Sequence, residues 1–369
     1  MDTSAPPFEA IPAGPVTLRP PRIDDVDDIV AACNDPLVQR FVPVPGPYTR
    51  DHAMDWITKQ VPAGGAAGGI QLAIVDPASD RMIGAVGIQR VQGTSAEIGY
   101  WVAPWARRRG AAVAATRALT AWAFRDRFTR LELRVVPENG ASQRVALAAG
   151  YSRDGILRGA GVDRSGRRVD FLCFTRLPAD PPGPVPRLLP DLPGGALTDG
   201  VVTVRPVGPD HAGDLVAMRS MPEVYAATVP AAPPDPAALT LACARSEARW
   251  LAGERAWLAV LADGAFAGEI GLHYTDPLSG EAMVGYNLVR AARGRGYASR
   301  GLRLVARHAF EHAGIARLTA GTAPDNTSSQ RVLTAVGFTR EGYLRGRLAG
   351  VDGGRRDNVL YGLLPGDLR

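Results

Sequence analysis

The chain has 369 residues, more than one hydrophobic core of usual size accommodates, so its length predicts two domains. With 46% hydrophobic and 21% charged residues, the composition is that of a globular protein and excludes a chain that is disordered throughout. The net charge of +5 comes almost entirely from arginine, since Lys59 is the only lysine. This modest, dispersed charge favours small anionic ligands over nucleic acid, or reflects an arginine-rich surface without a ligand.

Neither a membrane segment nor a secretion signal is visible. No apolar run approaches the ~20 residues of a membrane helix, and the N-terminal segment MDTSAPPFEAIPAGP has no basic start and no apolar core. Cys33, Cys173 and Cys243 lie far apart, which excludes a disulfide framework and a CxxC-type metal site. We therefore expect a reduced, cytoplasmic protein that binds neither membranes nor nucleic acid.

The first half of the chain predicts a mixed unit of helices and strands. An extended segment at 16–19 precedes a helix opened by Asp24 and Asp25. The glycine-rich segment 63–69 is expected to be a flexible connector. Strands are then expected at 72–75, 82–88 and 97–102, followed by a helix at 111–124, a strand at 131–135, a helix from Asn139 to Gly150 and a last hairpin that contains Asp170.

The second half repeats the first at a shift of 186 residues, which becomes 187 after Phe124 and Phe310. Val-Thr-Leu-Arg-Pro at 16–20 returns as Val-Thr-Val-Arg-Pro at 202–206, and Ser-Gln-Arg-Val at 142–145 returns unchanged at 329–332. So long a period excludes a solenoid and indicates a duplicated domain. Seven of the 18 residues from Pro178 to Gly195 are proline, which predicts an extended spacer. We therefore expect domains at 16–177 and 202–369, with a linker at 178–201 outside both cores.

An arginine- and glycine-rich turn stands between a strand and a helix in both halves. A glycine lets the backbone approach a ligand closely, and the first N–H groups of the following helix have no partner within the helix. Together with arginine, this arrangement suits a pyrophosphate. The predicted pyrophosphate-binding residues are Arg107, Arg108, Arg109, Gly110, Ala111 and Ala112 in the first half, and Arg293, Gly294, Arg295, Gly296, Tyr297 and Ala298 in the second.

A second motif follows each turn: Asn139 and Ser142 in the first half, Asn326 and Ser329 in the second, with Gly-aromatic eleven residues after each Asn. Helix capping by the Asn explains part of this pattern. The succession of strand, turn, helix, strand and Asn-x-x-Ser helix resembles the GNAT superfamily of acyl-CoA-dependent N-acetyltransferases. Both halves look most like its RimJ/RimL-type branch, whose members acetylate protein N-termini or small amines.

The resemblance implies an α+β fold of two tandem GNAT-like domains, each a mixed, mostly antiparallel sheet flanked by helices. Each sheet should splay after Tyr100 or Tyr286. It also implies acetyl-CoA as cosubstrate and no metal. The backbone at Val102, Ala103, Leu288 and Val289 would pair with the pantetheine arm, and Asn139 and Asn326 would reach the same arm or the thioester.

The resemblance further implies direct attack of a primary amine on the thioester in a ternary complex. The family's tyrosine acid falls here on Ala146 and Leu333, so Ser142 and Ser329 are the expected substitutes. Glu97 resembles the family's general-base glutamate, or else it orders the strand or binds the acceptor. The second half has Met283 there, which leaves Glu281 as its candidate base.

Other functions remain open. The segment from His308 to His312 fits the H-x-x-E-H pattern of zinc peptidases, but the first half has no histidine there, and zinc is not expected. A mycothiol-synthase-like tandem enzyme and a non-catalytic acyl-CoA-binding protein with degenerate copies are the alternatives. The acceptor, a protein N-terminus or a small amine, cannot be read from the sequence. The chain is expected to be a monomeric pseudo-dimer or a homodimer.

Overall fold

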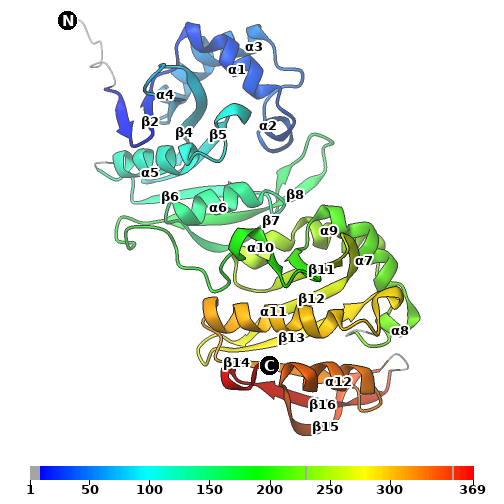
Figure 1. Ribbon diagram of the computed structural model, residues 1–369. Helices are drawn as coiled ribbons and strands as arrows, with labels where there is room; N and C mark the ends of the chain where they lie inside the picture. The colour runs from blue at the N-terminus through cyan, green and yellow to red at the C-terminus, as the bar shows by residue number, and fades with distance from the viewer. Residues whose placement is uncertain (1–8, 126, 229–230, 351–352) are drawn as a thin grey trace, which may run out of the picture. The chain divides into compact units, whose positions relative to one another are not determined.

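The computed structural model describes residues 9–125, 127–228, 231–350 and 353–369 (Figure 1). The chain divides into two compact units between Val185 and Pro186. Most of the N-terminal segment in which no secretion signal was found lies outside the described residues. Within the described residues, no helix is long and apolar enough to cross a membrane.

The first unit contains eight strands and two groups of helices. Its strands are β1 (Ile11–Ala13), β2 (Val16–Arg19), β3 (Ile70–Val75), β4 (Met82–Gln92), β5 (Ser95–Val102), β6 (Arg130–Val135), β7 (Ser152–Val162) and β8 (Arg168–Arg176). Its main helices are α1 (Val26–Cys33), α2 (Pro36–Phe41), α3 (Arg50–Asp55), α4 (Val61–Ala66), α5 (Ala111–Ala123) and α6 (Gly140–Ala148). Segment 63–69, predicted to be a loop, is helical as far as Ala66, so that prediction was wrong at its start.

The second unit repeats this order. Its strands are β9 (Leu197–Thr198), β10 (Val202–Pro206), β11 (Ala256–Ala262), β12 (Ala265–Asp276), β13 (Glu281–Leu288), β14 (Arg317–Thr322), β15 (Thr339–Ala349) and β16 (Arg355–Leu363). Its main helices are α7 (Ala212–Arg219), α8 (Pro222–Tyr225), α9 (Pro236–Ala244), α10 (Ser246–Leu251), α11 (Tyr297–His312) and α12 (Thr327–Val336).

Each unit is built on one mixed sheet. The strand orders are β1-β2-β3-β4-β5-β6-β8-β7 and β15-β16-β14-β13-β12-β11-β10-β9. The pairs β5–β6 and β13–β14 are parallel, and the other neighbouring pairs are antiparallel. The predicted α+β fold, with two tandem GNAT-like domains and mostly antiparallel sheets, is therefore confirmed.

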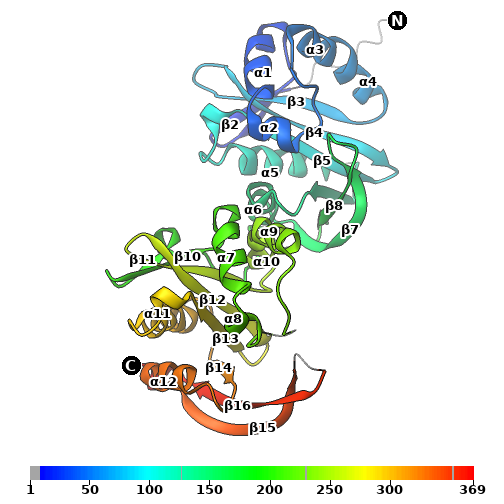
Figure 2. The ribbon, with the colours of Figure 1, turned by 90° about the vertical axis from the view of Figure 1, so that its right-hand side faces the viewer.

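Helices cover both faces of each sheet, because successive residues of a strand point to opposite sides. In the second unit, Val260 and Ile270 pack with Leu302 of α11 on one face. On the other face, Trp257 packs with Leu215 of α7, in a cluster that also contains α9 residues (Figure 2). The two faces of this sheet therefore pack against different helices.

Part of the predicted linker belongs to the second unit. Leu189 and Leu192 are 2% and 5% exposed and lie in its core, where the indole nitrogen of Trp250 donates to the carbonyls of Leu189 and Pro190. The expectation that the linker lies outside both cores is therefore wrong here, because two leucines among the prolines supply apolar surface. β9 also pairs with β10 as β1 pairs with β2. The repeated unit therefore begins upstream of residues 16 and 202.

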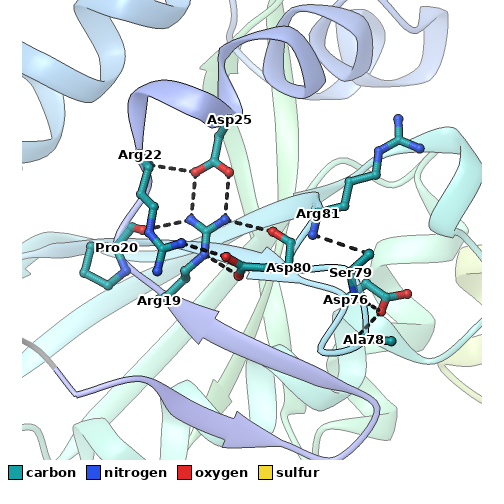
Figure 3. A network of polar contacts seen from close by, with 9 residues as sticks. All are labelled: Arg19, Pro20, Arg22, Asp25, Asp76, Ala78, Ser79, Asp80 and Arg81. Atoms are coloured by element: carbon teal, nitrogen blue, oxygen red, sulfur yellow. Dashed lines mark hydrogen bonds and ion pairs between the residues drawn. The ribbon is translucent and has the colours of Figure 1, made fainter.

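The Thr-x-Arg-Pro opening serves to hold the first unit together (Figure 3). Arg19 is 5% exposed, and its guanidinium donates to both carboxylate oxygens of Asp25, at 2.8 Å each. Its Nε donates to Asp80 Oδ1 at 2.9 Å, which ties β2 and the start of α1 to the turn between β3 and β4. In the second unit, His211 replaces Asp25, and Arg205 pairs instead with the exposed Asp210.

The late aspartates of both copies shape the last hairpin. Asp170 accepts a hydrogen bond from the N–H of Gly159 at 2.9 Å, and Asp357 accepts one from Gly346 at 2.6 Å. Both glycines have positive φ, at 61° and 59°, and lie where the hairpin register shifts. Each aspartate therefore stabilises an irregular strand, which explains its recurrence without a catalytic role.

Candidate active site

Each sheet opens between its two central parallel strands. β5 and β6 pair only through 95–97 and 130–132, and β13 and β14 only through 281–283 and 317–319. The predicted splay is present, but it begins after Glu97 and Met283, three residues earlier than expected. The hydroxyls of Tyr100 and Tyr286 reach the Ser142 and Ser329 carbonyls, at 3.4 Å and 3.1 Å. These side chains thus join β5 to α6 and β13 to α12 where the strands have separated.

The predicted pyrophosphate turns lie at the N-termini of α5 and α11. Gly110 and Gly296 precede the helices with φ of 78° and 77°, and neither helix start has a side-chain cap. The first N–H groups of both helices are therefore free to bind an anion, and the helix dipole favours one. Two residues earlier, Arg108 has φ of 61° where Gly294 has 74°. The second turn is thus less strained, because glycine adopts this conformation without steric cost.

The first arginine of each turn is held by an acidic residue. Arg107 Nη2 contacts Asp35 Oδ1 at 2.5 Å, and Arg293 Nη1 contacts Glu223 Oε1 at 3.4 Å. Burial opposes ionisation of Asp35, but Arg107 holds the pKa of that carboxyl below its usual range. Arg107 and Arg293 therefore anchor the turns to the neighbouring helices, which leaves the backbone and the later arginines to face an anion.

Two of the backbone positions predicted to meet the pantetheine arm are occupied. The N–H of Ala103 donates to Ile83 and that of Val289 to Ala267. The carbonyls of Ala103 and Val289 accept hydrogen bonds within the following turns. The strand edges that β6 and β14 leave unpaired instead cover 98–102 and 284–288, and so include Val102 and Leu288. The Leu288 carbonyl is nevertheless occupied, because Arg293 donates to it from Nε and Nη2, at 3.2 Å each. This difference arises because the chain begins to turn one residue earlier than the pattern suggested.

The Asn-x-x-Ser motifs are helix caps. Asn139 Oδ1 accepts from the Ser142 N–H at 3.1 Å, and Asn326 Oδ1 from the Ser329 N–H at 3.0 Å. The hydroxyls differ between the copies, since Ser142 Oγ lies 3.2 Å from the Asn139 amide nitrogen, whereas Ser329 Oγ lies 2.9 Å from the Tyr286 hydroxyl.

Glu97 lies in a network of charged side chains on the first sheet. It is 7% exposed, and Gln89 Nε2 donates to its Oε1 at 2.9 Å. Arg90 and Arg134 lie 3.4 Å and 3.3 Å from its Oε2. The strand register places Glu132 directly beside it. Glu132 was not among the predicted site residues, although its alternation with buried Leu131 and Leu133 could have placed it on this face.

Two neighbouring arginines favour the ionised form of Glu132. Burial opposes this ionisation, but hydrogen bonds from Arg130 and Arg134 hold the pKa of the Glu132 carboxyl below its usual range. Arg134 therefore bridges the two carboxylates of the first unit.

A large cavity opens in the second unit, with a volume of about 1120 Å³. Eight predicted site residues line it: Leu288, Arg293, Gly294, Gly296, Tyr297, Ala298, Asn326 and Ser329. Val289, Arg295 and Glu281 do not line it. Glu281 is paired instead with Arg317, at 3.4 Å from Nε.

A buried ion pair that the sequence analysis missed forms one wall of this cavity. Glu269 is 2% exposed, and Arg219 donates to both of its carboxylate oxygens, at 3.0 Å and 2.7 Å. Trp257 Nε1 and Asn287 Nδ2 also donate to it, at 2.6 Å and 2.9 Å. These four residues come from α7, β11, β12 and β13, so no local sequence motif predicts their contact. Every strong acceptor site of Glu269 is filled, which gives it a structural role rather than that of a base.

The candidate zinc pattern forms no recognisable site. Among the described residues, no group of three or more His, Cys, Asp or Glu side chains could hold a metal ion. The His308 and His312 rings lie 5.3 Å apart, and burial together with His312 lowers the pKa of His308.

Comparison with known proteins identifies the family. The family described as acetyltransferase (GNAT) domain matches residues 16–152 and again residues 202–339, which is more than half of the chain. The chain therefore belongs to the GNAT family of N-acetyltransferases and carries its domain twice. This confirms the tandem GNAT assignment and the class of enzyme, an acyltransferase.

Individual relatives match parts of the chain. The putative ribosomal N-acetyltransferase YdaF of Bacillus subtilis is 33% identical over 105 residues, which are 28% of this chain and 57% of the relative. The probable N-acetyltransferase YjcK of Bacillus subtilis is 41% identical over 64 residues, 17% of this chain and 35% of the relative. The chain thus spans about half the length, or less, of these relatives.

A solved structure of Mycobacterium smegmatis RimJ in complex with CoA-disulfide is similar at 27% identity, with a TM-score of 0.41. The match covers 47% of this chain and 87% of the RimJ chain.

Proposed function

We propose that this chain is an acetyl-CoA-dependent N-acetyltransferase of the RimJ/RimL type that acts on a primary amine. The observation that carries the proposal is the cavity of the second unit, where a splayed strand, an uncapped helix start and the Asn326 cap line one space. The ribosomal N-acetyltransferase among its relatives supports an amine acceptor, either a protein N-terminus or a small molecule.

The free N–H groups at the start of α11, beside Gly294 and Gly296, would bind the pyrophosphate of CoA. Arg295 has no role in this proposal, because it does not line the cavity. The edge of β13 from Val284 to Asn287, which β14 leaves unpaired, would take the amides of the pantetheine arm, as a neighbouring strand would. The corresponding groups of the first unit are the start of α5 and residues 98–102 of β5. Most of the rate gain would come from holding the amine and the thioester together, and from a backbone N–H that polarises the carbonyl.

The reaction needs two proton transfers. The neutral amine nitrogen attacks the thioester carbon, the carbon–sulfur bond breaks, and the departing thiolate accepts a proton. In the first unit, Glu97 is the candidate acceptor of the amine proton, with Ser142 as the candidate donor. In the second unit, Ser329 is the candidate donor, and the Tyr286 hydroxyl at 2.9 Å can replace its proton. Glu281 has no role in this proposal, because it does not line the cavity.

A thiol-release assay tests the proposal. The full chain is incubated with acetyl-CoA and a panel of amines that includes short peptides with free N-termini. Release of CoA that depends on an amine, with mass spectrometry of the acetylated product, supports the transferase. Binding of acetyl-CoA without release for every amine would favour a non-catalytic acyl-CoA-binding protein instead.

A further inference from the structure

Among the described arginines that line the cavity of the second unit, Arg255 alone has a buried side-chain nitrogen without a hydrogen-bond partner. Arg219 pairs with Glu269, and Arg249 with Glu254 at 3.2 Å. No described residue accepts a hydrogen bond from the side chain of Arg255, and its Nε is buried. Burial lowers the pKa of the Arg255 guanidinium. A buried N–H group that has lost water without gaining an acceptor is costly, and a ligand bound to the guanidinium in the cavity would supply acceptors.

The surroundings of Arg255 hold its guanidinium in place. Its Cζ lies 5.1 Å from the centroid of the Trp257 ring. A Cβ atom on Gly271 would lie only 2.8 Å from Arg255 Nη2, so the missing side chain of Gly271 provides the space. A planar guanidinium fixed in this way suits a carboxylate or a phosphate, which it can bind through two parallel hydrogen bonds.

Arg255 lies away from the proposed pyrophosphate site. It precedes β11, whose Trp257 pairs in register with Gly271 of β12, and Gly271 pairs with Gly285 of β13. Trp257 packs with α7 and α9, whereas the pyrophosphate turn begins α11 on the opposite face. Two strand spacings, about 10 Å, separate β11 from the splayed strand β13. An anion at Arg255 would therefore belong to the acceptor amine.

The first unit lacks this cation. There, Gln71 pairs with Gly87 as Trp257 pairs with Gly271, so Gly69 occupies the position of Arg255. The first unit instead presents Glu97 on this face, at the position of Met283. The two copies therefore differ in charge where the acceptor would lie.

We propose that Arg255 binds a carboxylate or phosphate group of the acceptor, so that the second unit prefers amines that carry such a group about 10 Å from the nitrogen. This inference rests on the proposed transferase function.

The test compares matched acceptors with and without the anion. One pair is the peptide amides Ser-Ala-Glu-Ala and Ser-Ala-Gln-Ala, and the other is an aminoalkyl phosphate and the corresponding amino alcohol. All proteins are full chains that carry Gly110→Asp, to silence the first unit. Arg255→Met is compared with Arg205→Met, which removes the same charge from the exposed pair with Asp210. Calorimetry also measures acceptor binding to the CoA-loaded chain.

We expect Arg255→Met to weaken binding of an anionic acceptor and raise its KM at least 10-fold. Its kcat, its CoA affinity and the constants of the neutral acceptor should not change, and Arg205→Met should change none of them. Arg255→Lys should restore part of the preference. The pair that responds distinguishes a peptide from a small phosphorylated amine.

Equal effects on anionic and neutral acceptors, or no effect on either pair, would overturn the inference. Absence of transfer to every amine, with Arg255-dependent anion binding retained, would refute the proposed function but leave the anion site standing.

Discussion

The two turns predict that one CoA binds to each unit and that a single carboxylate weakens binding at either site. Gly110→Asp and Gly296→Asp place a negative charge at the uncapped helix starts. Space is available, because a Cβ on Gly110 meets nothing within 4 Å and one on Gly296 meets only Ser299 Oγ, at 4.0 Å. Both variants should therefore fold.

The size of the effect follows from two terms. A side chain at positive φ costs about 1–2 kcal/mol, and an alanine variant has that cost too. A carboxylate about 5 Å from a phosphate adds about 3 kcal/mol of repulsion at an effective dielectric constant of 20, before salt screening. We therefore expect each aspartate variant to bind CoA about 30- to 150-fold more weakly at its own site than the matching alanine variant.

Isothermal titration calorimetry of the full chain measures this directly. The wild-type chain should bind two CoA molecules, and each aspartate variant should keep one tight site. Gly110→Ala and Gly296→Ala separate backbone strain from charge. If alanine and aspartate weakened binding equally, charge at the helix start would not govern the site. A wild-type stoichiometry of zero would end the acetyl-CoA proposal.

Three further predictions follow from the contacts. Arg19→Ala should lower the unfolding free energy of the first unit by about 3–5 kcal/mol in urea titrations, whereas Arg205→Ala should cost the second less than about 1 kcal/mol; equal losses would contradict the role of the buried pair. In a chain that carries Gly296→Asp to silence the second unit, Glu97→Gln should lower turnover about 10²- to 10⁴-fold with unchanged CoA affinity, and turnover equal to that of the Gly296→Asp chain would remove Glu97 as the base. Tyr286→Phe should lower turnover less than about 10-fold because a thiolate leaves readily. Burial raises the pKa of Tyr286 to about 12, so its hydroxyl stays protonated and the wild-type to variant ratio should be constant between about pH 7 and 10; a ratio that changes in this range would contradict that assignment.

The parts of the site that local chemistry determines could be predicted from the sequence. Gly110 and Gly296 stand at positions that need positive φ, and Asn139 caps a helix through its own side chain. Such features depend on a few neighbouring residues, so spacing alone reveals them. The internal repeat supported these predictions, because the same features occur in both copies.

The wall of the cavity in the second unit could not be predicted in this way. Arg219, Glu269 and Asn287 come from a helix and two strands and meet only after the sheet has formed. The linker shows a related limit, because proline content indicates an extended backbone but does not say where Leu189 docks. Tertiary packing determines both the composition of the cavity wall and the position of Leu189.

The docked segment shortens the joint between the two repeats. The Val185 N–H donates to Leu147 in the first unit, and Leu189 is held by Trp250 in the second, so three residues lie between the anchors. Each repeat keeps its own core on its own side of this joint. One polypeptide therefore carries the two candidate sites in equal numbers. A residue that lines the cavity of one repeat, such as Arg255 at the position of Gly69, can change without disturbing the core of the other repeat.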